Sequence, residues 1–258
     1  MNSSNKFNIA VLIDGDNAQP GLIKYILEEI SKYGKATIRR IYGDWTSPHM
    51  NGWKEVLNQY SISPIQKFAY TTGKNSTDSS LIIDAMDILH GKSVDGFCIV
   101  SSDSDYTGLA KRIREEGLFV MGIGRKTTPI AFVNSCEVFT FTEILQPQPQ
   151  KTVRTKKTKD KEDKDKQAAA TTKKTAQKTS KLSQPDLSIL DKAYEISSSE
   201  DEGTYISQVG LALRKIDPSF DPRNYGYKTL TQLFQSLDKY EVINNEVNGL
   251  NHPLVRKK

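Results

Sequence analysis

Acidic residues follow two apolar segments of the chain at the point where each segment ends. Asp14 closes the run FNIAVLID, and Asp103 and Asp105 come directly after the run DGFCIVS. Because like charges repel, two carboxylates so close to a buried element predict a positive charge between them. Asp78 opens a further segment, STDSSLIIDAMDILHG, whose apolar residues have helical spacing. We expect these four carboxylates to meet in one crevice.

The chemistry that such a crevice supports is metal-dependent. Converging carboxylates raise one another's pKa and destabilise a fold unless a divalent cation compensates their charge. Hard oxygen ligands with room for water suit Mg²⁺ or Mn²⁺, and an ion held in this way can activate a water against a phosphodiester. We predict metal ligation by Asp14, Asp103 and Asp105, and a catalytic role for these residues together with Asp78. Asn17 is expected either to cap the first helix or to orient a water or phosphate.

Other polar residues near the acidic segments are candidates for contact with a substrate. Serines 101, 102 and 104 can donate hydrogen bonds to the carboxylates or to a phosphate, and Ser102 is our candidate for the phosphate. Lys74, in the loop before the acidic helix, is either a solvated lysine or a cation that neutralises the scissile phosphate. Asp84 lies about 240° around the helix from Asp78, so we expect it to be solvated or to give secondary support.

The elements that must position these residues alternate along the first half of the chain. Apolar runs predict strands at 7–14, 36–43, 62–70, 95–101, 118–124 and 137–141, and helical spacing predicts helices at 21–34, 50–60, 76–91, 106–117 and 128–134. This alternation predicts an α/β fold, a doubly wound parallel sheet with helices on both faces. With the strand order 3-2-1-4-5, the first and fourth strands are neighbours where the order reverses, which is where such sheets bind ligands.

The charge of the chain divides it into parts. The net charge of +5 comes from residues 150–181, which hold twelve Lys or Arg and four Asp or Glu, whereas 1–149 carry −1 and 182–258 carry −2. The Lys-rich segment has almost no large apolar residue, so it predicts a disordered linker at 147–184 that acts as a spacer or as a polybasic arm for phosphates. It separates a first domain at 1–146 from a second at 185–258.

The second domain has a different pattern. Helical spacing recurs at 187–199, 205–216 and 229–240, and two short segments at 240–247 and 250–255 could form a ribbon. We predict a small winged helix-turn-helix domain. Four residues gather just before its last helix and offer aromatic faces for bases and cations for phosphates: Arg223, Tyr225, Tyr227 and Lys228. The two tyrosines would alternatively be packing anchors for that helix.

Composition excludes some classes of protein. No apolar stretch approaches the roughly 18 residues that span a bilayer, and the polar start MNSSNKFN lacks the features of a signal peptide. We expect a cytoplasmic protein without membrane contact. Cys98 and Cys136 lack the spacing of a zinc site or a disulfide framework, so we expect both to be core residues.

Three acidic blocks taken together resemble the NYN domain family, a branch of the PIN-like nucleases. The blocks are VLIDGDNA, KNSTDSSLIIDAMDIL and CIVSSDSDYTGLAKRIREEGLFVMGIG, within residues 7–145. The resemblance implies metal-dependent ribonuclease chemistry, with Asp14, Asp78, Asp103 and Asp105 at the acidic cluster of the family and Asn17 at its characteristic asparagine. Residues 221–243, DPRNYGYKTLTQLFQSLDKYEVI, resemble the OST-HTH or LOTUS domain, which is associated with RNA binding or protein partners.

The function expected from the sequence is therefore that of an endoribonuclease that uses Mg²⁺ or Mn²⁺ and carries an RNA-binding or partner-binding module. One alternative is an inactive RNA-binding regulator that retains the acidic pocket. A second is a phosphatase of the haloacid dehalogenase type, because DGDNA resembles the DxDx[TV] signature of that family, although Ala18 stands where Thr or Val is expected.

Overall fold

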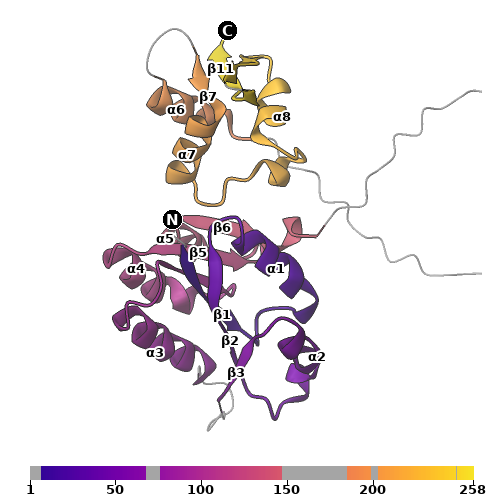
Figure 1. The fold of residues 1–258 in the computed structure, drawn as a ribbon, viewed down its shortest axis with the longest axis vertical. Coiled ribbons are helices and arrows are strands. Elements are labelled where there is room, and N and C mark those ends of the chain that lie inside the picture. Colours follow the sequence, from indigo (N-terminus) through magenta and orange to yellow (C-terminus); the bar gives the residue numbers. More distant parts are fainter. Residues whose placement is uncertain (1–6, 68–75, 147–184, 199–202, 248) are drawn as a thin grey trace, which may run out of the picture.

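The chain folds into two units that lie side by side (Figure 1). The structure, a computed structural model, describes residues 7–67, 76–146, 185–198, 203–247 and 249–258. The α/β domain comprises the elements from β1 to the short helix η4 (Thr142–Ile144), and the C-terminal domain comprises those from α6 (Leu187–Ser197) to β11 (Leu254–Lys257). The predicted linker at 147–184 lies outside the described residues.

The α/β domain is built on a six-stranded parallel sheet in the order β3-β2-β1-β4-β5-β6. The predicted order 3-2-1-4-5 is confirmed, and β6 adds the last strand at the edge. The order reverses between β1 and β4, so the ends of these two strands form the crevice at which the acidic segments meet. The strands are β1 (Asn8–Asp14), β2 (Lys35–Gly43), β3 (Ser63–Gln66), β4 (Gly96–Val100), β5 (Phe119–Gly124) and β6 (Val138–Phe141).

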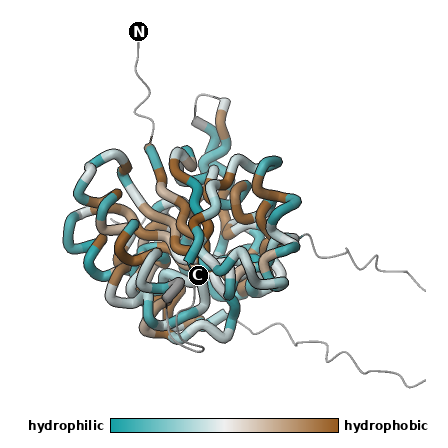
Figure 2. Tube along the Cα trace, turned by 90° about the horizontal axis from the view of Figure 1, so that it is seen from below, coloured by the Kyte–Doolittle hydropathy of each residue, from teal (hydrophilic) through white to brown (hydrophobic). Residues whose placement is uncertain are grey.

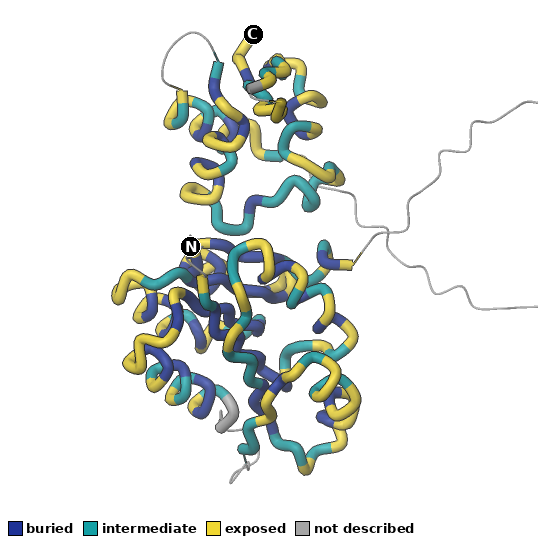
Figure 3. The backbone as a smooth tube through the Cα atoms, viewed as in Figure 1, coloured by how far each residue is buried: buried dark blue, intermediate teal, exposed yellow. Residues whose placement is uncertain are grey.

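Helices cover both faces of this sheet, which confirms the predicted fold class. Ala10 and Leu12 of β1 pack in one apolar cluster with α3 (Ser76–His90), α4 (Thr107–Glu115) and α5 (Ile130–Ser135). The alternate β1 residues, such as Val11, pack in a second cluster with α1 (Ile23–Ile30) and α2 (Asn51–Gln59). Both faces of the strands are therefore buried, which explains their unbroken apolar runs (Figures 2 and 3).

One polar contact fixes α3, the helix that carries Asp78, to the sheet. Asp84 accepts hydrogen bonds from the guanidinium of Arg40 and the hydroxyl of Tyr42, both on β2. Tyr42 is fully buried, and burial followed by the contact with Asp84 raises the pKa of its hydroxyl. Asp84 therefore gives structural support, one of the two roles expected for it.

Replacing Asp84 by Ala should lower the free energy of unfolding by about 2–3 kcal/mol, because it leaves a buried hydroxyl and a half-buried guanidinium without their acceptor. Urea denaturation followed by circular dichroism would measure the change. Asp87→Ala is the matched control, since Asp87 is exposed on the same helix, and it should alter stability by less than about 0.5 kcal/mol. Equal effects of the two substitutions would contradict the supporting role of Asp84.

The C-terminal domain has the three helices and small sheet of a winged helix-turn-helix domain, as predicted. The helices α6, α7 (Ile206–Ile216) and α8 (Leu230–Gln235) enclose a core that includes Leu190, Val209, Leu213 and Phe234. The sheet has the order β7-β11-β8, and a two-stranded hairpin lies between β8 and β11 in the chain. Its strands are β7 (Thr204–Tyr205), β8 (Tyr240–Ile243) and β11, and those of the hairpin are β9 (Glu246–Val247) and β10 (Leu250–Asn251).

The C-terminal domain contacts the α/β domain along the free edge of β6 (Figure 1). The backbone amide of Phe139 in β6 donates to the carbonyl oxygen of Pro218 at 2.8 Å. At the end of α1, the guanidinium carbon of Arg214 lies 5.6 Å from the ring centroid of Tyr33. These contacts join residues on both sides of the predicted linker, so the two domains share an interface.

Two further expectations concern the core and the membrane. Cys98 and Cys136 are both buried with free thiols, as expected of core residues, and burial raises the pKa of the Cys136 thiol to about 12. Within the described ranges, no helix combines the length and hydrophobicity that crossing a membrane requires.

Candidate active site

Asp14 is the buried carboxylate at the bottom of the acidic site. It ends β1 next to β4 and is 1% exposed. Its Oδ2 accepts hydrogen bonds from Asn17 Nδ2 at 2.7 Å and from Ser101 Oγ at 2.8 Å, and its Oδ1 accepts the amide of Asp16 at 3.1 Å. Burial raises the pKa of this carboxyl, the bonds from Asn17 and Ser101 lower it, and the charge of Asp78 raises it again.

Gly15 lets the chain turn sharply after Asp14. Its amide donates to the carbonyl oxygen of Tyr42 at 2.9 Å, and a Cβ at this position would lie only 2.7 Å from that oxygen. A side chain at position 15 would therefore push the turn away from β2. Asn17, two residues on, does not cap a helix, because the N-cap position of η1 (Pro20–Leu22) is Gln19. The hydrogen bond of Asn17 to Asp14 shows that this asparagine orients the buried carboxylate.

Asp103 and Asp105 are held by a short helix that follows β4. Asp103 is the N-cap of η3 (Ser104–Tyr106), and its Oδ1 accepts the amide of Asp105 at 3.0 Å. The amide of Asp103 in turn donates to Ser101 Oγ at 3.1 Å. Ser101 thus links Asp103 to the buried Asp14. The two-residue spacing is explained by helix capping, because the Asp103 side chain accepts the amide of Asp105 in the first turn of η3. This cap brings both carboxylates to one end of the sheet.

Asp78 reaches the site from the first turn of α3. Tyr106, which is fully buried, donates its hydroxyl to Asp78 Oδ1 at 2.6 Å. Burial is the main cause of the raised pKa of Asp78; the bond from Tyr106 opposes it, and the charges of Asp103, Asp105 and Asp16 add to it. Asp78 is therefore positioned by a partner on the segment that also carries Asp103 and Asp105.

Three of the four predicted carboxylates form a compact cluster. One oxygen each of Asp78, Asp103 and Asp105 lies within 4.8 Å of the others. Carboxylate oxygens at this spacing fit the ligand preference of Mg²⁺ or Mn²⁺. The pKa of Asp78 is raised mainly by burial, and the charges of Asp103 and Asp105 add to this effect. Asp14 stands outside this group. The geometry thus brings Asp78 together with Asp103 and Asp105, as expected, and metal ligation by Asp14 stays a prediction.

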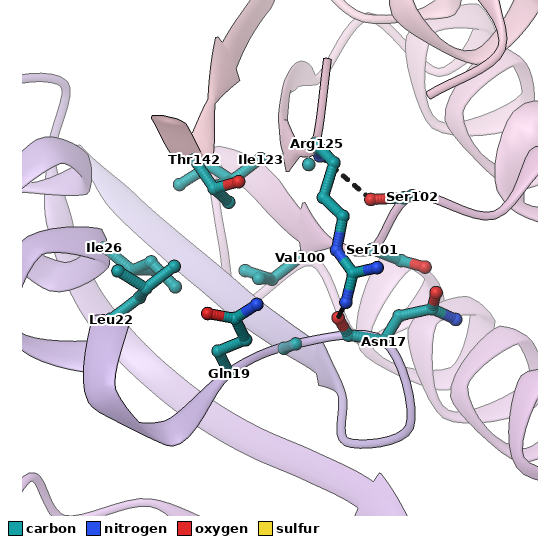
Figure 4. Close-up of a pocket in the computed structure, with 12 residues that line it drawn as sticks. Asn17, Gln19, Leu22, Ile26, Val100, Ser101, Ser102, Ile123, Arg125 and Thr142 are labelled. Atoms are coloured by element: carbon teal, nitrogen blue, oxygen red, sulfur yellow. Dashed lines mark hydrogen bonds between the residues drawn. The ribbon is translucent and has the colours of Figure 1, made fainter. Parts of the chain in front are cut away.

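A small pocket lies beside the buried Asp14, between β4, β5 and the turn after β1 (Figure 4). Its volume is about 20 Å³, room for one water molecule, and its lining includes Leu22, Ile26 and Ile123. Arg125, which directly follows β5, extends over this pocket; its amide donates to Ser102 Oγ at 2.9 Å and its Nη2 to Asn17 O at 3.4 Å. An exposed guanidinium is thus held beside the acidic site.

Two residues of the site escaped sequence analysis. Tyr106 is adjacent to the acidic block, but nothing in the sequence pairs it with Asp78, which is 28 positions away. Arg125 could have been identified, because it follows the strand next to β4 and therefore lies at the same edge of the sheet as Asp103. Ser102, the predicted phosphate contact, is half-buried and accepts from Arg125, and Lys74 lies outside the described residues.

The predicted contacts in the C-terminal domain have other partners in the structure. The guanidinium of Arg223 forms ion pairs with Asp221 and, at 2.9 and 3.0 Å, with both oxygens of Glu29 in α1. Tyr225 packs on Phe220 with ring centroids 5.6 Å apart, and Tyr227 is partly buried against the core. Both tyrosines thus have the packing contacts that were the alternative expectation. Lys228 is exposed.

Fold and site together define a PIN-like α/β domain with an acidic cluster at the switch point of its sheet. Residues 8–145 match the NYN domain, and residues 181–251 match the OST-HTH/LOTUS domain. The chain belongs to the NYN domain family and carries a C-terminal OST-HTH/LOTUS domain. This assignment favours the nuclease interpretation of DGDNA over the phosphatase one. The buried Asp14 agrees, since a nucleophilic carboxylate must reach its substrate.

Comparison with individual proteins adds little to the family assignment. No curated protein matches the chain. Among solved structures, a protein of unknown function from Vibrio parahaemolyticus is similar, with 20% sequence identity and a TM-score of 0.44. The similarity covers 54% of this chain and 94% of the other.

Proposed function

We propose that this protein is a metal-dependent endoribonuclease whose C-terminal domain binds RNA or a protein partner. The observation that carries the proposal is the cluster of Asp78, Asp103 and Asp105 within 4.8 Å at the carboxyl ends of β1 and β4. Two separate elements of an NYN domain, α3 and η3, supply these carboxylates, and Tyr106 joins the two elements at the cluster.

Each residue of the site has a defined task in this proposal. Asp78, Asp103 and Asp105 would hold Mg²⁺ or Mn²⁺, and such an ion, when bound, supplies the activation of a water and the stabilisation of the leaving oxygen. Asp14 adds negative charge behind the cluster and fixes Asn17 and Ser101 by hydrogen bonds. Tyr106 keeps Asp78 Oδ1 in place through its hydroxyl.

Arg125 offers a second cation for the task that the sequence suggested for Lys74, which lies outside the described residues. Its exposed guanidinium lies beside the acidic site and is held near Asn17. A fixed cation there offsets the repulsion between the carboxylates and the phosphates of an incoming RNA strand. RNA, as opposed to DNA, is the substrate class of the PIN-like nucleases that the chain resembles.

Incubation of end-labelled single-stranded RNA with the full chain tests the proposal. Internal cleavage that requires Mn²⁺ or Mg²⁺ and stops with EDTA is the expected result. RNA that is bound without cleavage in every metal tested would contradict the nuclease and favour the inactive regulator. Hydrolysis of p-nitrophenyl phosphate without RNA cleavage would favour the phosphatase.

Metal binding should stabilise the protein more at neutral than at acidic pH. The pKa values of Asp14 and Asp78 are raised from 3.8 in the folded protein. Without metal, the contribution of these two groups to stability is therefore fully present below pH 3.8, the unfolded-state value. It is lost as the pH rises through their raised folded-state pKa values. Asp78, as a proposed ligand, must be deprotonated to hold metal, so the stabilisation by metal has the opposite pH dependence.

Thermal denaturation with and without Mn²⁺ measures this effect. With Mn²⁺ at about 100 times its Kd, stabilisation is about 2.7 kcal/mol, a rise in Tm of roughly 5–10 °C for a chain of this size. We expect this rise at neutral pH and a smaller one as the pH falls toward the raised pKa of Asp78, where protons compete with the metal for this carboxylate. A shift independent of pH would place the metal elsewhere.

A further inference from the structure

Two grooves run along the contact between the domains, which we call the interdomain seam. One groove, of about 520 Å³, lies between the end of α1 and helix α7, and the other, of about 480 Å³, lies between the start of β6 and the same helix. Tyr33, Leu211 and Arg214 line both grooves, so the two form one continuous depression. Each groove is within the volume range of ligand sites in proteins.

Some of the charged side chains in the seam neutralise one another in ion pairs at the contact between the domains. Glu29 is 5% exposed and accepts both Arg223 and Lys32, the latter at 2.7 Å, while Asp221 also binds Arg223. These two acids and two bases cancel. At the other end, Arg114 and Glu137 line the second groove together; burial raises the pKa of the Glu137 carboxyl, and the Arg114 charge opposes this effect.

Three cations of the seam have no such compensation. Arg214, Lys215 and Lys228 are exposed and line one or both grooves. None of them pairs within 4.0 Å with a carboxylate among the residues that the structure describes. Residues 1–149 and 182–258 each carry a net negative charge, so three uncompensated cations along one depression stand out against the charge of both domains.

We propose that the interdomain seam binds the phosphate backbone of single-stranded RNA through Arg214, Lys215 and Lys228. The choice of RNA rests on the proposed function, whereas the site follows from the charges and grooves above. Leu211 and Ile216, which are 61% and 36% exposed and line the seam, provide apolar surface for ribose and base faces. Proteins that hold single strands without reading sequence combine a cationic groove with side chains, chiefly aromatic, on which bases stack, and Tyr33 lines both grooves here.

The site explains how the second domain can contribute to RNA binding although its tyrosines are packed. The seam needs both domains, since Tyr33 and Glu29 come from one and all three cations from the other. A strand held there lies on the surface that joins the domains, so binding depends on their docking. The proposal thus assigns RNA contact to the interface and leaves Tyr225 and Tyr227 to the core.

Fluorescence anisotropy with a labelled oligouridine in EDTA tests the seam without cleavage. The triple variant Arg214→Gln, Lys215→Gln, Lys228→Gln should bind about tenfold or more weakly, and the slope of log K against log salt should fall by about 2, since each phosphate contact contributes about 0.7. The matched control removes three exposed lysines that line neither groove: Lys54→Gln, Lys92→Gln and Lys192→Gln.

A second variant separates RNA contact from docking. Arg214 also lies over Tyr33, so its loss affects the interface, whereas the double variant Lys215→Gln, Lys228→Gln leaves the interdomain contacts intact. It should still lower the salt slope by about 1.4.

Several outcomes would overturn the site. The site is wrong if the triple variant and the control variant weaken binding equally, or if the wild-type chain binds no RNA. It is also wrong if polyglutamate displaces the oligouridine at equal ionic strength, because this result indicates an acidic protein partner. The nuclease proposal is judged separately, by cleavage of RNA by the wild-type chain in Mn²⁺.

Discussion

Replacing Asp103 by Asn is expected to slow the cleavage of RNA in Mn²⁺ by about 100-fold or more, because one of three clustered carboxylates loses its charge. The amide oxygen of Asn can still accept the amide of Asp105 and keep the cap of η3. The same substitution relieves repulsion with Asp78 and Asp105, so stability in EDTA should be unchanged or higher. Initial rates on labelled RNA and thermal denaturation in EDTA provide the two readouts.

The opposite directions of these two effects distinguish a metal ligand from a structural residue. Asp95→Asn is the matched control, because Asp95 also accepts a backbone amide, that of Asn8 at 2.7 Å, at the start of β1 and away from the cluster. It should leave the cleavage rate within about twofold of wild type. An Asp103→Asn protein that cleaves RNA at nearly the wild-type rate would remove the cluster from the mechanism.

Replacing Arg223 by Ala should release the C-terminal domain from the α/β domain. Arg223 is 28% exposed and is the partner of Glu29 across the interface, and its loss leaves that buried carboxylate with Lys32 alone. Removal of one partner of a buried pair costs about 3–5 kcal/mol, and discounting for the partial exposure gives about 2 kcal/mol. Such a change shifts the docking equilibrium about 30-fold toward the open form.

Small-angle X-ray scattering of the full chain measures this release as an increase in the radius of gyration and in the maximum dimension. Arg256→Ala is the matched control, because Arg256 pairs with Glu241 at 2.9 Å inside the C-terminal domain. Its scattering should match that of the wild type. Identical profiles for Arg223→Ala and wild type would show that the Glu29 contact is dispensable for docking.

The architecture of the α/β domain was predictable because each of its strands has a simple pattern. β1 and β4 are buried on both sides and therefore appear in the sequence as unbroken apolar runs. The order 3-2-1-4-5, expected of a doubly wound sheet, makes these two strands neighbours. The residues at which helices and strands begin and end were harder to predict. The helix predicted at 21–34 is the short η1 followed by α1, since Pro20 starts a tighter turn, and the two-residue strand β7 is too short to show any periodicity.

The depth of the site residues could not be read from the sequence. Its position at the end of β1 puts Asp14 at the edge of the sheet where the site lies. Only the fold shows that Asn17 and Ser101 donate hydrogen bonds to Asp14, and that the compact cluster consists of Asp78, Asp103 and Asp105. Arg223 illustrates the same limit. Its neighbours in the chain suggested a ligand contact, whereas its strongest partner, Glu29, is 194 positions away.

The bond between Phe139 and Pro218 has a consequence for any shortened form of the protein. β6 ends the sheet, and its amides and carbonyls on the outer side are available to pair with another strand. The second domain occupies part of that row, so a fragment that stops near residue 146 would present an open template for strand addition. Masking part of this edge against strand addition is thus a contribution of the second domain that does not depend on RNA.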